Sequence, residues 1–481
     1  MQQKRLGGIV AALALGASAI LLAPNSAQAV PSFARQTGFA CEACHTVFPE
    51  LTPFGRRFKL NAYTIDNLPQ VSGITQNKDQ TLLLNQLPPL SFMFQMSYTS
   101  TKSAVPDTCA GDVSGNPPCT NGTVPTDALA KNGQVLFPQQ ASLFYAGRIA
   151  PNLGAFVQMT YDGTSGSFGW DNTDIRYARL ATSNFLWGVS FNNNPTVQDV
   201  WNSTPAWQSP FDQRSVTAPA PGISASPAGY ALGTTMLDGG LADAGVAGVS
   251  VYGWWNNSIY AEIGGYHSAP AASQLDSSLN APVLDGVAPY WRVAYEHQWE
   301  RNSWEVGAYG VNAKLFMGDG SALSGPADKF DDWALDTQYQ YIGDVHLFTA
   351  TATYIDEKQH WDASNPATYT ANASDTLKTY RIGGQYYYQR KYGAGLGYFS
   401  TTGSEDPTLY ATGDALVGFA NNKPDSNGWV GELDWVPYQN TKIALQYTVY
   451  NKFNGAKDNY DGNGRNASDN NTLYLLGWLN F

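Results

Sequence analysis

The stretch Leu90-Ser91-Phe92-Met93-Phe94-Gln95-Met96-Ser97-Tyr98-Thr99 decides the fold of this chain. From Leu90 on, every second side chain is large and apolar, and most of those between are polar. A period of two indicates a β-strand, because successive side chains of a strand point to opposite faces. A strand with one apolar and one polar face is typical of a barrel whose outside meets lipid and whose inside meets water.

The same alternation recurs along the chain to its C-terminal strand, where Leu473, Leu475, Leu479 and Phe481 share one face. Each run is close to the nine to eleven residues of a tilted membrane strand. We therefore predict an all-β fold, a transmembrane antiparallel β-barrel of about sixteen strands over residues 89–481, with starts near 90, 141, 154, 173, 185, 248, 258, 289, 303, 332, 346, 376, 393, 428, 441 and 472.

The connections between these strands alternate in length. Tight ones at 151–153, 256–257, 300–302, 343–344 and 438–440 interleave with long ones at 102–138, 194–247, 268–287, 402–426 and 453–470. Short periplasmic turns and long outer loops are the expected asymmetry of an outer-membrane barrel. With an even strand count, whatever precedes the first strand lies on the periplasmic side. The loop 194–247 either folds into the lumen or caps the outside.

The composition agrees with a membrane barrel better than with a soluble β-sandwich or propeller. Charged residues are 14% and aromatic residues 13% of the chain, against about 25% charged in ordinary soluble domains. The net charge of -12 argues against nucleic acid and favours cationic partners. The strand phase places a mixed, mainly acidic set of side chains inside, which we expect to be water-lined walls: Glu262, Glu296, Glu305, Asp336, Glu432, Asp434, Arg292 and Arg381.

An export signal precedes the barrel. Lys4 and Arg5 come before the apolar run 6–23, and Ala27-Gln28-Ala29 has the small-residue pattern of a cleavage site. Residues 1–29 are therefore predicted to be a signal peptide, with the mature chain starting at Val30.

The segment 30–88 carries Cys41-Glu42-Ala43-Cys44-His45, the CxxCH spacing of c-type haem attachment. Two cysteines one helical turn apart form the thioether bonds, and the adjacent histidine becomes the proximal iron ligand. We predict one haem c, held covalently by Cys41 and Cys44 and ligated by His45. A Cys41–Cys44 disulfide and half of a zinc site are the alternatives, although zinc would need a second ligand pair.

The other candidate site residues are weaker. Met93 is the nearest candidate for a sixth haem ligand, and its phase points it into the lumen, where it could equally be a packing residue. Cys109 and Cys119 share one loop and are predicted to form a structural disulfide. Arg56, Arg57 and Lys59 could pair with haem propionates or with lumen carboxylates. The other histidines, His267, His297, His346 and His360, are expected at the surface or rim.

The stretches Pro31-Ser32-Phe33-Ala34-Arg35-Gln36-Thr37-Gly38, Cys41 to His45, and Phe48-Pro49-Glu50-Leu51-Thr52-Pro53-Phe54-Gly55-Arg56 resemble the fused cytochrome-porin family, outer-membrane monohaem c-type cytochromes of iron-oxidising bacteria. The rest of the chain resembles that family in architecture and length. The resemblance implies a haem segment that plugs a porin. It also implies electron transfer from extracellular Fe(II) to a periplasmic c-type cytochrome or copper protein.

Two classes of function follow from the sequence. The first is an electron conduit in the outer membrane, in enzymatic terms an iron(II):cytochrome c oxidoreductase, with the haem segment on the periplasmic side or inside the lumen. The second is a diffusion porin or transporter in which the haem segment is a gate, sensor or structural plug. A soluble haem peroxidase is disfavoured, because no second histidine lies near the motif.

Overall fold

The computed structural model describes residues 30–46, 49–65, 70–71, 84–103, 133–195, 199–201, 215, 217–222, 224–225, 231–232, 234–243, 245–269, 283–316, 324–411 and 418–481. The predicted signal peptide 1–29 and the predicted Cys109–Cys119 disulfide lie outside these residues. Within them, no helix is long and apolar enough to cross a bilayer.

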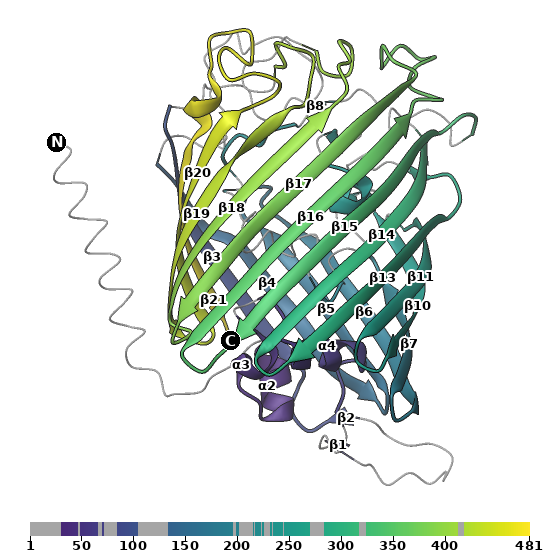
Figure 1. Cartoon of the computed structure of the whole chain (residues 1–481), viewed down its shortest axis with the longest axis vertical. Helices are drawn as coiled ribbons and strands as arrows, with labels where there is room; N and C mark the ends of the chain where they lie inside the picture. Colours follow the sequence, from purple (N-terminus) through teal and green to yellow (C-terminus); the bar gives the residue numbers. More distant parts are fainter. Residues whose placement is uncertain are drawn as a thin grey trace, which may run out of the picture.

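The described strands form a closed antiparallel β-barrel with sixteen long strands (Figure 1), as the sequence predicts. Every long strand pairs with its neighbours in the chain, and β21 pairs with β3 to close the ring. The strands are β3 (Leu90–Thr101), β4 (Gln134–Ala150), β5 (Leu153–Asp162), β6 (Ser167–Thr182), β7 (Phe185–Asn192), β10 (Val246–Trp255), β11 (Ile259–Ser268), β13 (Ala288–Trp299), β14 (Asn302–Phe316), β15 (Asp328–Ile342), β16 (His346–His360), β17 (Ser374–Tyr388), β18 (Tyr392–Gly403), β19 (Ser426–Tyr438), β20 (Thr441–Lys452) and β21 (Thr472–Asn480).

Short elements complete the description. A two-residue strand, β12 (Val283–Leu284), extends the sheet beside the end of β14. The remaining elements are α2 (Pro31–Thr37), α3 (Cys41–Cys44), α4 (Pro53–Leu60), β1 (Gln70–Val71), β2 (Leu84–Asn85), β8 (Ser224–Ala225), β9 (Ala231–Leu232), η2 (Met236–Gly240), α5 (Leu241–Asp243) and η3 (Ala467–Asn470).

Burial follows the predicted alternation along the strands. In β3 the side chains of Ser91, Met93 and Gln95 are buried, whereas Phe92 and Phe94 lie on the outer face. The outer face carries exposed large apolar residues on every side of the barrel, for example Ile263, Leu396 and Leu433. Such a surface is stable next to lipid but not next to water, so the barrel spans a membrane.

Several strands are longer than predicted. β4 starts at Gln134 instead of near 141, and β6 at Ser167 instead of near 173. The prediction placed both starts too late, because the first residues of β4 pair with the end of β3 and those of β6 pair with the end of β5. The extra residues carry the same alternation, with Val135, Phe137, Phe168 and Trp170 on the outer face.

The two ends of the barrel differ as predicted. Short turns join β4 to β5, β10 to β11, β13 to β14, β15 to β16, β17 to β18 and β19 to β20 at one end, and most connections at the other end are long. The helices α2, α3 and α4 lie at the short-turn end (Figure 1). We call the described residues 30–46 and 49–65 the plug.

The long connection between β7 and β10 enters the lumen, which decides a question that the sequence leaves open. Val200 and Trp201 are each 2% exposed and pack with Leu60 of the plug and Trp254 of the wall. Farther along, the backbone N–H of Met236 donates to Glu357 (2.7 Å) and that of Leu237 donates to Asp332 (2.9 Å). The described parts of this connection therefore fill space inside the barrel.

Candidate functional site

The CxxCH motif forms a single helical turn. α3 covers Cys41–Cys44, and the backbone N–H of His45 donates to the carbonyl of Cys41 at 2.8 Å. Residues three apart on a helix share one face, so Cys41 and Cys44 belong to the same side of the turn, and His45 follows as the C-cap with an extended backbone. Both cysteines are free thiols, so the alternative Cys41–Cys44 disulfide is not formed.

The imidazole of His45 is oriented by a backbone carbonyl. Its Nδ1 lies 3.2 Å from the carbonyl oxygen of Glu50. Because a carbonyl oxygen can only accept, Nδ1 carries the proton and Nε2 keeps its lone pair. Burial lowers the pKa of His45 to about 4, against the opposing effect of the Pro49 and Glu50 carbonyls. The ring is therefore neutral at ordinary pH, in the form that ligates a metal.

The second helix of the plug holds the motif by close backbone contact. α4 begins after Thr52, whose side chain caps the helix by accepting from the N–H of Gly55 at 3.1 Å. Thr52 also donates from its backbone N–H to the carbonyl of Cys44 at 2.9 Å and from its hydroxyl to the carbonyl of Ala43 at 2.7 Å. A Cβ on Gly55 would lie 2.1 Å from the Cys44 oxygen, so only glycine fits there.

One buried arginine locks the plug to the wall. Arg56 binds both carboxylate oxygens of Glu296 on β13, at 2.9 and 3.0 Å. The same guanidinium donates to the side chains of Gln338, Gln340 and Ser303 at 2.9 to 3.1 Å. The Arg56 and Glu296 side chains are 1% and 0% exposed. The expected carboxylate pairing of Arg56 is thus made with the barrel.

Further contacts seat the plug along the lumen. The Tyr63 hydroxyl donates to Asp174 at 2.5 Å, and the hydroxyl of Tyr252 donates to the carbonyl of Leu60 at 2.7 Å. Lys59 donates to the carbonyl of Asp199 at 3.3 Å, while Arg57 is exposed. Because these contacts involve several strands and the inserted connection, the plug is an integral part of the lumen.

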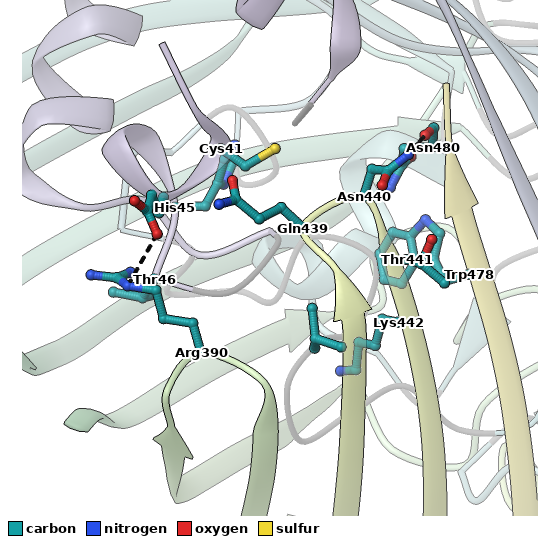
Figure 2. Close-up of a pocket in the computed structure, with 12 residues that line it drawn as sticks. Cys41, His45, Thr46, Arg390, Gln439, Asn440, Thr441, Lys442, Trp478 and Asn480 are labelled. Atoms are coloured by element: carbon teal, nitrogen blue, oxygen red, sulfur yellow. Dashed lines mark hydrogen bonds and ion pairs between the residues drawn. The ribbon is translucent and has the colours of Figure 1, made fainter. Parts of the chain in front are cut away.

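A cleft between the plug and the wall opens at the motif (Figure 2). In it the sulfur of Cys41 points toward the space in front of Gln439 and Asn440. The plug contributes Cys41, Glu42, His45 and Thr46; the wall contributes Arg390, Val436, Gln439, Asn440, Thr441, Lys442, Trp478 and Asn480. Cys44 is half-buried and lies outside this lining.

The donor geometry fits a porphyrin better than a zinc ion. Zinc needs three or four His, Cys or carboxylate donors that converge on one point. No group of three such side chains converges in this way among the described residues. A porphyrin instead takes thiols at its rim and an imidazole at its centre. Burial also raises the pKa of Cys41 to about 12 and that of Cys44 to about 11, so both side chains are neutral thiols in this structure.

Met93 lies inside the barrel, as its phase predicts, but not on the cleft. Its side chain is fully buried in an apolar cluster with Phe58, Tyr63 and Trp478. It does not line the cleft on which His45 opens. Its role as a sixth ligand stays a prediction. Of the other histidines, His267, His297 and His346 are exposed and His360 is half-buried.

The acidic and basic side chains predicted to face inward do so, and most of them are buried in ion pairs. Glu262 instead accepts hydrogen bonds from Ser250 and Tyr260, and the half-buried Arg381 pairs with Asp238. Arg292 contacts Asp336 at 2.6 Å, Glu305 at 3.2 Å and Asp199 of the inserted connection at 3.4 Å. A second cluster is Lys442 with Glu432 at 2.7 Å and Asp434 at 3.3 Å. The expectation of water-lined walls is therefore wrong for these residues, because the plug and the inserted connection occupy the space.

Sequence reasoning missed Arg390. It lies in the turn between β17 and β18, where Gln389 and Arg390 have φ of 53° and 55°, and its side chain reaches Glu42 of the plug at 3.5 Å. The alternation within a strand shows which side chains face inward. It does not show which turn lies next to the plug. The sequence contains one signal for a special role of Arg390, which is an arginine at a turn position that favours Gly or Asn.

No protein-family model matches the sequence, and no curated protein matches it. Among solved structures, it is similar to OmpF of Salmonella typhi, solved in complex with daunomycin, at 12% identity and a TM-score of 0.46, covering 82% of this chain and 97% of that chain. It is also similar to the anion-selective porin of Comamonas acidovorans, at 13% identity, a TM-score of 0.43 and coverage of 82% and 98%. OprB of Pseudomonas putida matches at 8% identity, a TM-score of 0.46 and coverage of 82% and 93%.

Proposed function

We propose that this protein is an outer-membrane c-type cytochrome that carries electrons from extracellular Fe(II) through a porin-like barrel to a periplasmic c-type cytochrome or copper protein. The observation that carries the proposal is the helical turn of Cys41, Cys44 and His45, docked inside the short-turn end of a membrane barrel. Haem c bound at this turn supplies one-electron redox chemistry.

The residues of the plug have the roles that such a site needs. Cys41 and Cys44 provide thiols on one side of a turn, and His45 provides a neutral imidazole whose orientation is set by the Glu50 carbonyl. Gly55 and Thr52 hold the turn against α4. Arg56 ties α4 to the wall, so the site is fixed relative to the membrane.

The position of the plug supports a conduit. A bilayer has no redox groups, whereas a barrel can shield a redox group from lipid and let electrons cross. Fe(III) precipitates near neutral pH, so oxidation of iron at the outer surface keeps the precipitate out of the periplasm. The short-turn end is the periplasmic end of an outer-membrane barrel, which leaves the motif close to soluble carriers.

The alternative is a diffusion porin or transporter with the haem segment as gate or sensor. The barrel architecture favours it. The ion pairs of Arg56 and Arg292 and the inserted Trp201 oppose free diffusion, because they fill the lumen beside the plug.

Stopped-flow spectroscopy of the purified protein mixed with Fe(II) tests the proposal. We expect the α-band of reduced haem c to appear at a rate that rises with Fe(II) concentration, and a small periplasmic cytochrome to reoxidise the protein. A Cys41→Ser, Cys44→Ser variant, which has no thioethers, is the control. If Fe(II) leaves the oxidised spectrum unchanged while neutral solutes pass through the reconstituted barrel, the gated porin replaces the conduit.

A further inference from the structure

The cleft beside Cys41 and His45 has two cationic side chains on its wall, Arg390 and Lys442. The two differ in the carboxylates that they already contact. Lys442 already contacts the carboxylates of Glu432 and Asp434. Arg390 has one carboxylate contact, from its Nε to Glu42 at 3.5 Å, and the Glu42 side chain is 48% exposed. A long contact to a solvated carboxylate stabilises little.

Arg390 also has a buried hydrogen-bond donor that lacks an acceptor. Among the described residues, no side chain or backbone group accepts a hydrogen bond from its Nη1, although that atom is shielded from solvent. A buried guanidinium N–H without an acceptor costs free energy. The cost disappears if an anion enters the cleft, and a planar carboxylate suits the fork of a guanidinium best.

The turn that carries Arg390 gives an independent observation. Gln389 and Arg390 both have positive φ, the geometry of a tight hairpin that favours Asn and Gly. The turn between β10 and β11 has the same geometry and uses Asn256 and Asn257, with φ of 50° and 53°. Backbone preference therefore explains the asparagines of that turn but does not explain an arginine at 390.

We propose that Arg390 is the anchor for a porphyrin propionate. The inference rests on the proposed haem site and adds a contact from the barrel: the porphyrin is attached covalently to the plug and is also bound by a charged group of the wall. Arg56 of the plug is bound to Glu296 and Lys59 to the Asp199 carbonyl, and Arg57 is exposed and does not line the cleft. Arg390 is thus a positioning residue that also sets the local charge.

The test is the midpoint potential of the purified holoprotein, measured by spectroelectrochemical titration with mediators. A positive charge near a redox centre favours the form that carries one more electron. Arg390→Asn removes the charge and suits the turn. We expect it to lower the ratio of reduced to oxidised protein at a fixed potential by about tenfold, which is a shift of about 59 mV for a one-electron couple.

Two further variants make the result specific. Arg390→Lys keeps the charge and should restore most of the wild-type potential. Arg301→Asn is the matched control, because Arg301 lies in another short-turn connection, is 52% exposed and pairs with Asp344; its potential should equal that of the wild type. Heat-modifiable gel migration and covalent haem staining confirm that each variant is folded and loaded.

Three results would overturn the anchor: an Arg390→Asn potential equal to the wild type, an Arg390→Lys potential as low as that of Arg390→Asn, or an equal shift in Arg301→Asn. The outcome is separable from the proposed function because mediators, not Fe(II), supply the electrons. A shifted potential in a protein that Fe(II) does not reduce would reject the donor and keep the anchor. A wild type without covalent haem would reject both.

Discussion

At the scale of single residues, Gly55 joins the two helices of the plug. An alanine there would place its Cβ 2.1 Å from the Cys44 carbonyl oxygen, so α4 and the CxxCH turn must separate. We expect Gly55→Ala to destabilise the plug by roughly 1–3 kcal/mol, the usual cost of overpacking, and to reduce covalent haem per folded barrel. Haem staining of the heat-modifiable band measures this. Gly431→Ala is the control, because no atom lies within 4 Å of a Cβ at Gly431; an equal loss there would contradict the explanation.

Lys59 gives the plug a dependence on pH. Burial, with help from the nearby charge of Arg176, lowers its pKa to about 8, whereas an unfolded lysine titrates near 10.4. Between these two pKa values the unfolded chain binds more protons than the folded chain does. The stability of the plug should therefore rise as pH increases from about 8 to 10, and fall when the pH is lowered from 10 to 8.

Replacement of Lys59 by methionine should remove this pH dependence and stabilise the plug at pH 7 by at most roughly 3 kcal/mol, since the pKa falls by a little over two units and one unit corresponds to about 1.4 kcal/mol. The resistance of the plug to thermolysin, measured from pH 7 to 10, checks both points. The idea fails if wild type and Lys59→Met show the same slope with pH.

At the scale of elements, α4 is held to β13 and β15 through Arg56. Loss of one partner of a buried pair leaves the other charge without compensation, which costs roughly 3–5 kcal/mol. We expect Arg56→Met to expose the plug to thermolysin while the barrel stays intact. Arg57→Ala changes the next residue of the same helix, which is exposed, and should behave like the wild type. Equal sensitivity of the two variants would show that the Arg56–Glu296 contact does not hold the plug.

The outer face of the strands gives a second test. Leu445, in the middle of β20, is 43% exposed on the apolar outside. Leu445→Arg should destabilise the barrel by roughly 2–4 kcal/mol, as a cation at the bilayer midplane does. His297→Arg also faces outward, but near the short-turn rim beside Trp299, and should cost far less. Urea unfolding in lipid vesicles measures the free energy of unfolding of both variants. An equal loss of stability in the two would contradict a bilayer midplane near Leu445.

The strands were predictable because each one repeats a local pattern. In β3 the apolar and polar side chains alternate on the two faces of one strand, and this alternation appears in the sequence without knowledge of the neighbours. The charges inside were predictable as inward-facing for the same reason. Their pairing was not, because Arg292 meets Asp199 across a long connection whose path has no periodic signal.

The chemistry of the site stays a prediction from the sequence, and its surroundings were only partly predictable. Cys41, Cys44 and His45 are adjacent in the chain, so their spacing alone indicates the group they suit. The partners of the plug lie at sequence separations of 240 and 284 residues, as for Arg56 with Glu296 and Gln340. Arg390 lies near the motif because its turn comes next to α3 in the closed ring. No local sequence pattern indicates which turn takes that place.

At the scale of the whole molecule, the lumen is occupied from the plug to the inserted connection. The full-length protein in liposomes should therefore admit small neutral sugars far more slowly than an open sixteen-stranded barrel does. Removal of residues 30–88 should leave the ring closed, because the seam between β21 and β3 does not involve the plug, and should speed sugar entry. Liposome swelling measures both, and rapid swelling with the full-length protein would contradict a filled lumen.

The burial of Cys41 has a consequence for the order of assembly. Cys41 as a residue is only 6% exposed once the plug is seated, and the strands that surround it come later in the chain than the motif. We expect the proposed haem to be attached before the ring closes, because both cysteines of the motif are fully accessible at that stage. In that order of events the plug already carries the proposed haem when the wall closes around it. A ring that closes first would then hinder attachment of the proposed haem at Cys41.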